Sequence, residues 1–276
     1  MTWQVKDITD KAYFAYGDIF GGIDSPLDGH KELVVSNSFI KNIFKSNLFC
    51  FLQSGGTIVD EALQEIFDVG SGFHCYCLEN ADFEDRFHVS DYTDASKTTT
   101  QIRKSDFEFI ENAYKSLETK YPNIIDQEHA ELAIFGEIDG VRVKCKIDKL
   151  NITKVGNRYT KVEIIDLKSV YFDMFSFKKS PDGTRWKLRQ MLSDVGYDIQ
   201  AYFYTRLVEE WLLSINQHCE VTFALVVASK DTHETQKFQV GAEMFESGKM
   251  KFDSVWGDIV SFIRDGKKSL IDYEVL

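Results

Sequence analysis

The stretch Val162-Glu163-Ile164-Ile165-Asp166-Leu167-Lys168-Ser169 is apolar until it presents an acid and a lysine two positions apart. Side chains two positions apart on a β-strand share a face, so Asp166 and Lys168 are expected to project together. Asp148 stands near the end of the preceding predicted strand. If the turn at Gly156-Asn157 closes a hairpin, Asp148 lies on the neighbouring strand beside that pair. The sequence therefore predicts two carboxylates and an ammonium group at one place on a sheet.

Such a group of side chains suits hydrolysis at phosphorus. Carboxylates hold a hard divalent cation through oxygen and leave positions for water and a phosphate oxygen. The cation activates the water and neutralises developing charge, while the lysine orients or deprotonates the water or supports the phosphate. An isolated acid–x–lysine triplet is usually an ordinary ion pair on a surface strand, so the interpretation depends on the other motifs.

The hairpin belongs to a predicted α/β core. Alternating apolar residues, with Asp139-Gly140 as a tight turn, predict three strands, at 131–138, 141–150 and 159–168. Ser105 and Glu108 form a capping-box pattern that opens a helix before these strands. After these strands, a long helix is predicted at 188–214 and a buried strand at 221–228. The expected order is therefore helix, three strands, helix, strand.

The segments outside this core are assigned more simply. A helix is predicted behind Ser36-Asn37-Ser38, where side chains suited to N-caps precede a helix-type apolar spacing. Residues 1–35 are expected to be irregular, and residues 80–104 are expected to form a polar loop. A second helix is predicted at 57–79, an edge strand at 234–240 and a closing helix at 243–265.

Four further residues are candidates for the site. Gly70 and His74 form a GxxxH pattern near the end of a predicted helix, and a neutral imidazole there could bind a metal ion. Glu131 opens the first predicted strand, and Gln200 and Tyr204 share a helix face at positions i and i+4. Each has an ordinary alternative: a core or surface histidine, a solvent-facing glutamate, a surface glutamine and a core tyrosine.

The net charge of −12 restricts the class of protein, because phosphate contacts dominate nucleic-acid affinity. It argues against a passive DNA-binding module, and much less against an enzyme that gathers carboxylates around a metal. One local exception follows the Asp166–Lys168 motif, where five basic residues accompany the single acid Asp182. We expect this segment to contact DNA phosphates, through Lys178, Lys179, Arg185, Lys187 and Arg189. Lys41 and Lys45 are further candidates for holding a terminal phosphate.

The cysteines and the hydropathy exclude other classes. The chain has five cysteines, an odd number, and no two of them have CxxC spacing. This pattern argues against a disulfide framework and against a four-cysteine metal site. Cys75 and Cys77 would point roughly 200° apart on a helix, which disfavours zinc. No apolar run approaches the ~20 residues of a membrane span, and the N-terminal residues lack the apolar core of a secretory signal. We therefore expect a cytoplasmic protein without a membrane partner.

Together these features resemble the PD-(D/E)xK nuclease superfamily, in the branch of the RecB-family nuclease domains and the RecE-type exonucleases of phages and prophages. The resemblance spans about residues 35–230, and its N-terminal part is the segment Val35-Ser36-Asn37-Ser38-Phe39-Ile40-Lys41. The matching motifs occur in the order of that family, as Gly70xxxHis74, Ile147-Asp148-Lys149, Asp166-Leu167-Lys168 and Gln200xxxTyr204. One departure is Asp166, since the family often has glutamate there.

The resemblance implies a restriction-endonuclease-like fold, with a central mixed sheet flanked by helices. Its parts would be an N-terminal helical region with the GxxxH motif (1–104), a nuclease core (105–240) and a C-terminal helix (241–276), in one compact domain. The implied metal ligands are His74, Glu131, Asp148, Asp166 and the backbone carbonyl of Leu167. Lys168 would be the catalytic lysine, with Gln200 and Tyr204 supporting the site or contacting DNA.

The function implied is a Mg²⁺- or Mn²⁺-dependent exonuclease without an organic cofactor. It would degrade linear double-stranded DNA from 5′ to 3′, beside a single-strand annealing protein in phage-type recombination. By analogy it would be a homo-oligomer in a bacterial or phage-infected cell. Two alternatives stay open: an endonuclease or single-strand exonuclease of the same fold, and a non-catalytic DNA-binding protein. The intact set Asp148, Asp166 and Lys168 argues against the second.

Overall fold

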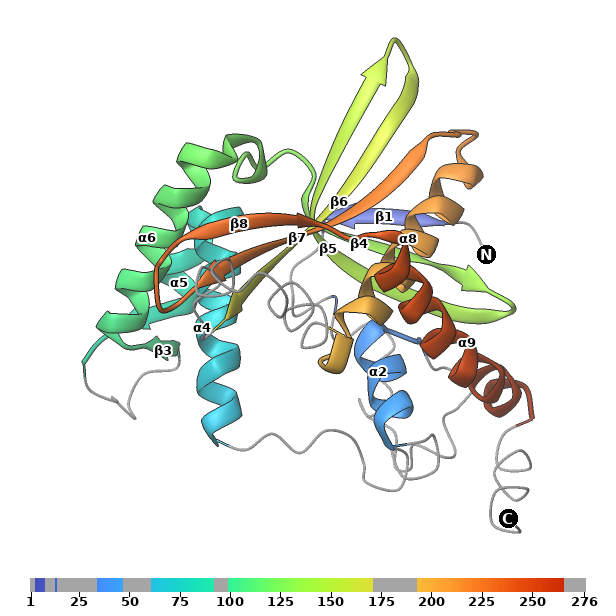
Figure 1. The fold of residues 1–276 in the computed structure, drawn as a ribbon, viewed down its shortest axis with the longest axis horizontal. Coiled ribbons are helices and arrows are strands. Elements are labelled where there is room, and N and C mark those ends of the chain that lie inside the picture. Colours follow the sequence, from blue (N-terminus) through green and yellow to red (C-terminus); the bar gives the residue numbers. More distant parts are fainter. Residues whose placement is uncertain are drawn as a thin grey trace, which may run out of the picture.

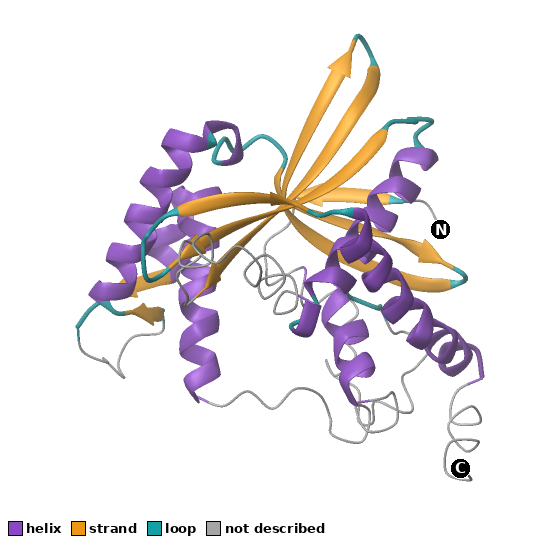
Figure 2. Cartoon of the chain, in the orientation of Figure 1, coloured by secondary structure: helices purple, strands orange, loops and turns teal. Residues whose placement is uncertain are grey.

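A six-stranded mixed sheet forms the centre of the protein, in the order β1-β4-β5-β6-β7-β8 (Figures 1 and 2). The computed structural model describes residues 3–7, 13, 34–46, 61–91, 99–170 and 193–265. Neighbouring strands are antiparallel except β6 and β7, which run parallel. The strands are β1 Gln4–Asp7, β4 Ala130–Ile138, β5 Val141–Val155, β6 Arg158–Val170, β7 Glu220–Ser229 and β8 Thr235–Gln239.

Helices cover both faces of this sheet, which makes three layers (Figure 1). One face carries α2 Asn37–Ser46, α8 Tyr197–Ser214 and α9 Ala242–Asp265. The other carries α4 Glu61–Leu78 and α6 Lys104–Lys120. The alternation of β5 explains the first core, because Val141, Val143, Cys145 and Ile147 all pack toward α2, α8 and α9. No helix in the described part of the chain has both the length and the apolar character that a membrane span requires.

The predicted core order is confirmed. It appears as α6, β4, β5, β6, α8 and β7, with turns at Asp139-Gly140 and Gly156-Asn157. The helix behind Ser36, the edge strand and the closing helix are confirmed as α2, β8 and α9. In the second predicted helix, the described part runs from Glu61 to Leu78.

Four expectations about local structure are wrong. The described parts of 80–104 are not simply loop, since they form η2 Asn80–Asp82, α5 Phe83–Arg86, β2 Phe87–Val89 and β3 Thr100–Ile102. The first 35 residues include a strand, β1, which pairs with β4. Helix α6 is preceded by Arg103 and has no side-chain cap, so the capping box does not form. The helix predicted at 188–214 is interrupted at Gly196, where φ is +80°.

Candidate metal and phosphodiester site

The site begins where β5 and β6 stop pairing. Their ladder ends at the pair Lys149–Ile165, and Asp148 and Asp166 are the next residues of the two strands. There Asp148 Oδ2 accepts a hydrogen bond of 2.7 Å from the backbone N–H of Leu167. The Asp148 carboxylate thus accepts the hydrogen bond that a partner strand would otherwise accept from the Leu167 N–H. This bond holds Asp148 beside the Asp166–Lys168 motif.

The peptide of Leu167 joins Asp148 to helix α4. Its carbonyl oxygen lies 2.7 Å from His74 Nε2, and His74 Nδ1 lies 3.4 Å from Asp148 Oδ2. Gly70, one turn earlier on α4, faces β6, because a Cβ built there would stand 3.7 Å from Ser169 Oγ. The GxxxH motif therefore sets α4 against β6 with the imidazole at the end of the β5–β6 ladder.

Glu131 completes a group of possible metal ligands. One ligand atom from each of His74, Glu131 and Asp148 lies within 4.8 Å of the other two. Glu131 has a positive φ of +51°, a conformation that costs a non-glycine residue free energy and is found mostly where function requires it. Its Oε2 lies 2.5 Å from Lys146 Nζ.

Asp166, Lys168 and Gln200 form the second half of the site, on the α8 side of β6. Asp166 Oδ2 is ion-paired with Lys168, and Oδ1 accepts a hydrogen bond of 2.6 Å from Gln200 Nε2. Lys168 Nζ also lies 5.1 Å from the centre of the Tyr197 ring, a cation–π distance. The ammonium of Lys168 and the backbone of Leu167 thus connect the two halves, since Lys168 Nζ donates to Leu167 O at 3.3 Å.

Burial and neighbouring charge raise the pKa values of Asp148 and Glu131. Burial, followed by the charge of Asp166, raises the pKa of Asp148 to about 7. Burial and the charge of Asp148 likewise raise the pKa of Glu131 to about 7. Both shifts arise because like charges meet where little water reaches. A cation placed among these carboxylates would remove that repulsion.

The basic groups shift in opposite directions. Burial and the charge of Lys168 lower the pKa of His74, so its imidazole is neutral near pH 7 and able to bind a metal. Burial alone would lower the pKa of Lys168, but the carboxylates of Asp166 and Asp148 outweigh it and the pKa is raised. Lys168 is therefore an ammonium ion across the neutral range.

The donor set fits a divalent cation. It combines an imidazole nitrogen, carboxylates and the Leu167 carbonyl, all ligands that Mn²⁺ accepts and mostly the oxygen ligands that Mg²⁺ prefers. Asp166 is 2% exposed, and the ammonium of Lys168 contacts its Oδ2. A bound metal ion could take the place of that ammonium at the carboxylate oxygen.

The remaining predicted residues divide into three groups. Lys41 lies beside this site, with its Nζ 5.4 Å from the centre of the Tyr197 ring, and burial followed by the charge of Lys168 lowers its pKa to about 8. Tyr204 packs in the core against Phe223, and burial, with the charges of Asp166 and Asp148 among the smaller causes, raises its pKa well above the usual value. The predicted basic segment, with Lys178, Lys179, Arg185, Lys187 and Arg189, lies outside the described residues.

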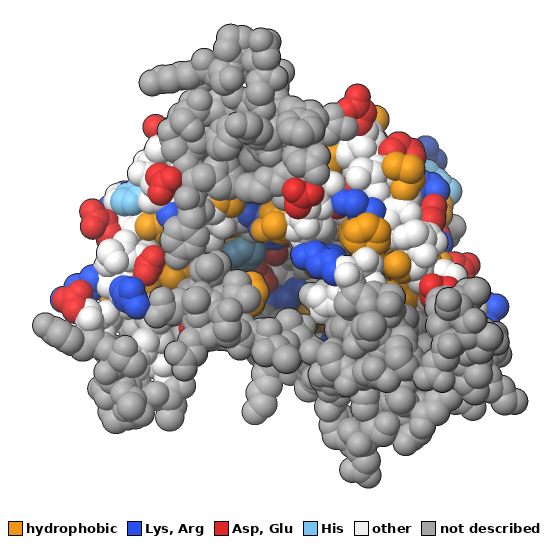
Figure 3. Space-filling model, turned by 60° about the horizontal axis from the view of Figure 1, so that its bottom comes forward, with side chains coloured by type: hydrophobic (Ala, Val, Ile, Leu, Met, Phe, Trp, Pro, Cys, Tyr) orange, Lys and Arg blue, Asp and Glu red, His pale blue; other side chains and the backbone are white. Residues whose placement is uncertain are grey.

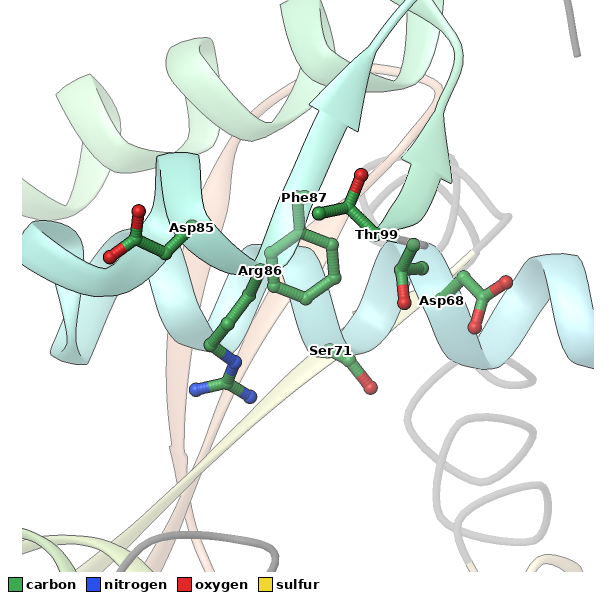
Figure 4. Close-up of a pocket in the computed structure, with 7 residues that line it drawn as sticks. Asp68, Ser71, Asp85, Arg86, Phe87 and Thr99 are labelled. Carbon is green, nitrogen blue, oxygen red and sulfur yellow. The ribbon is translucent and has the colours of Figure 1, made fainter. Parts of the chain in front are cut away.

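Two hollows among the described residues differ in charge, and the one that Lys41 lines has the charge expected for DNA. On the face shown in Figure 3, histidine, acidic and basic side chains gather in a hollow near the centre. Lys41, Lys45 and Lys251 line a hollow of about 310 Å³ with Asp194 as its acid. The other hollow, of about 430 Å³ (Figure 4), has Arg86 against Asp68 and Asp85. Its lining is net acidic, which disfavours phosphate.

Sequence reasoning missed two residues at the site, Lys146 and Tyr197. Lys146 lies among several lysines of β5 that look alike in the sequence, and its partner Glu131 comes from another strand. Tyr197 follows the unpredicted break at Gly196, so its position depended on that break. The spacing of Tyr197 to Gln200, three residues on one helix, is the signal that could have identified it.

Comparisons with known proteins agree with this fold. The chain matches the family described as "PDDEXK-like domain of unknown function (DUF3799)" over residues 36–268. Its structure resembles that of a "Putative exonuclease" from Eubacterium rectale, with a TM-score of 0.55 and 15% sequence identity. That alignment covers 94% of this chain and 87% of the other, and it supports the fold alone. No curated protein matches. Because the family match extends over most of its length, the chain belongs to this family of PDDEXK-like domains.

Proposed function

We propose that the protein is a metal-dependent DNA nuclease that hydrolyses phosphodiester bonds, and that it acts as an exonuclease on linear duplex DNA. The family and the site together support a nuclease. The observation that carries the proposal is the Leu167 peptide: its N–H binds Asp148, its carbonyl oxygen contacts His74, and the ion pair of Asp166 and Lys168 flanks it.

The metal ligands in this proposal are His74, Glu131, Asp148, Asp166 and the carbonyl oxygen of Leu167. A bound Mg²⁺ or Mn²⁺ would supply Lewis acidity, which lowers the pKa of water and neutralises charge on the phosphate. The protein's own contribution is to bring three carboxylates to one place, at the cost of repulsion visible in the raised pKa values of Asp148 and Glu131. DNA cleavage then depends on those carboxylates being ionised.

Lys168 is proposed to act on the phosphate and the water through its positive charge. Its raised pKa keeps the amine protonated near neutral pH, so it is better suited to hold a phosphate oxygen and orient water than to accept a proton. Gln200 positions Asp166 by donating to Oδ1, and Tyr197 contacts the ammonium from the other side. These contacts restrict the motion of both charged groups.

Lys41 and Lys45 are proposed to bind a phosphate of the DNA. They line the basic hollow on α2, and Lys41 interacts with the charges of Lys168 and Asp166. Lys178, Lys179, Arg185, Lys187 and Arg189 extend this proposal along the strand, on the basis of their charge and sequence position. The 5′-to-3′ polarity, the homo-oligomer and the annealing partner rest on the resemblance to RecE-type exonucleases, and the cytoplasmic location rests on the hydropathy of the sequence.

The test is digestion of matched DNA substrates by the purified protein with Mg²⁺. Linear duplexes labelled at either end, with and without a 5′ phosphate, are compared with a closed circle of the same sequence. We expect the linear duplexes to shorten from the 5′ end and the circle to resist. Cutting of the circle would show that the protein is an endonuclease and not an exonuclease. Release of label from the 3′ end first would show that it degrades DNA from 3′ to 5′. No cleavage of any substrate, with Mg²⁺ or Mn²⁺, would overturn the nuclease itself.

A further inference from the structure

Lys146 lies inside the group of metal ligands. It is two residues before Asp148 on β5, so the two side chains share a face of the strand. Its Nζ is 2.5 Å from Glu131 Oε2, and the side chains of both residues are 11% exposed. Removing one ion of such a buried pair is strongly destabilising, because the other charge is left unpaired.

The charges around the ligands are nearly balanced before any metal binds. Three carboxylates, those of Glu131, Asp148 and Asp166, face two ammonium groups, those of Lys146 and Lys168. With a neutral imidazole these groups carry one negative charge, and the ammonium of Lys41 is counted with the further DNA phosphate that it is proposed to bind. One divalent cation and one phosphodiester bring the total to zero, whereas two divalent cations would leave a charge of +2. An unbalanced charge in a partly buried site is costly, because the surroundings screen it poorly.

We propose that the ammonium of Lys146 takes the place of a second metal ion, so that the site holds a single divalent cation. Lys146 would then be a positioning residue: it holds Glu131 and neutralises one carboxylate, and it does not touch the DNA. The inference rests on the proposed function only in treating this group as a metal site. The number of bound ions is independent of whether, and from which end, DNA is cleaved.

Manganese binding tests this number. The full chain is titrated with Mn²⁺ at physiological salt, and bound ions are counted by calorimetry and by the electron paramagnetic resonance signal of free Mn²⁺. We expect one tight ion per chain in the wild type. Lys146→Met removes the ammonium with little change in volume, and we expect it to take up a second ion at least about tenfold more tightly than the wild type does. The tenfold change corresponds to about 1.4 kcal/mol.

Two variants control for charge and for folding. Lys161→Met changes the net charge equally on the exposed part of β6, and Lys146→Arg keeps the cation; both should bind one ion. Two ions of similar affinity in the wild type would overturn the inference, even if Lys146→Met does not fold. A single ion in folded Lys146→Met would also overturn it. No Mn²⁺ bound by the wild type would overturn the metal-dependent nuclease as well, which separates the two failures.

Discussion

Asp166 is the most buried of the three acids of the site. Its side chain is 2% exposed, with Gln200 on one oxygen and Lys168 on the other. A buried carboxylate without a cation is costly, so the pair is expected to be coupled in stability as well as in activity. Changes at either residue therefore need an activity measurement and a folding measurement together.

Asp166→Asn and Lys168→Met should each slow cleavage of linear duplex DNA by about 100-fold or more. The first removes a metal ligand and the second a charge that supports the phosphate, and losses of this size follow removal of one such electrostatic group. Initial rates with Mg²⁺ measure the effect, and circular dichroism checks folding. Glu163→Gln is the matched control, because Glu163 lies on the same strand but pairs with Lys237. Rates like those of the parent in both variants would remove the catalytic assignment.

Metal binding should strengthen as the pH rises through 7. The pKa values of Glu131 and Asp148 are raised to about 7, so protons compete with the cation below that pH. We expect the apparent affinity for Mn²⁺ to increase about tenfold or more between pH 6 and pH 8, as measured by calorimetry. An affinity that does not change over this range would show that these carboxyls are not ligands.

The stability of the metal-free protein should change with the opposite sign. Acids whose pKa is raised on folding bind more protons in the native state than in the unfolded state. Their contribution to stability is therefore present below about pH 4 and is lost as the pH rises to about 7. Added Mg²⁺ should restore it, so the increase in Tm on adding Mg²⁺ should be larger at pH 8 than at pH 6.

The lysines of β5 show what the sequence leaves open at this scale. The two-residue period of a strand predicts that Asp166 and Lys168 share a face, and the structure agrees. It places Lys144 and Lys146 on one face of the strand and Lys149 on the other, but it does not identify the partner of any of the three. Their partners are the carbonyl of Tyr13, the carboxylate of Glu131 and the segment around Asp126, which come from distant parts of the chain. Only the tertiary structure assigns these roles.

Helix α8 begins at the site because the chain turns at Gly196. This glycine has a φ of +80°, and a Cβ there would lie 2.9 Å from Cε of Lys41. The turn lets the first residues of α8, Tyr197 and Gln200, reach Lys168 and Asp166. Glycine is suited to this position by its freedom at positive φ and by its lack of a side chain.

Gly196→Ala should therefore destabilise the protein and displace Lys41. The left-handed backbone costs alanine about 1 kcal/mol, which lowers Tm by roughly 2–4 °C in a protein of this size. We also expect weaker binding of duplex DNA in Ca²⁺, measured by fluorescence anisotropy. Gly257→Ala is the matched control on α9, where a Cβ meets nothing within 4 Å, and it should raise Tm slightly. A Gly196→Ala variant as stable as the parent would contradict the role of this turn.

Elements were predicted well where the apolar period was strong. The strands β4, β5, β6 and β7 and the helices α2 and α9 all follow it. The short strands β1, β2 and β3 have three or four residues each, too few to show a period, and they exist because a neighbouring strand pairs with them. The break at Gly196 was missed because a single glycine is tolerated inside a helical pattern.

At the scale of the molecule, the site lies between the two helical layers, where β5 and β6 part. Helix α4 brings His74 from one layer, and α8 brings Gln200 from the other. The net charge of −12 is consistent with a nuclease under this arrangement, because several acids are proposed to bind the metal and the nearby hollow on α2 is basic. The sequence predicted the family and the motif residues, while their assembly depends on packing of both layers against one pair of strands.

The most direct measurement of the central claim is anomalous diffraction from crystals of the protein soaked with Mn²⁺. We expect an anomalous peak in contact with the carboxylates of Asp148 and Asp166, with His74 and Glu131 around it. A fully occupied Mn²⁺ bound elsewhere, with these carboxylates still turned to their lysines, would contradict it.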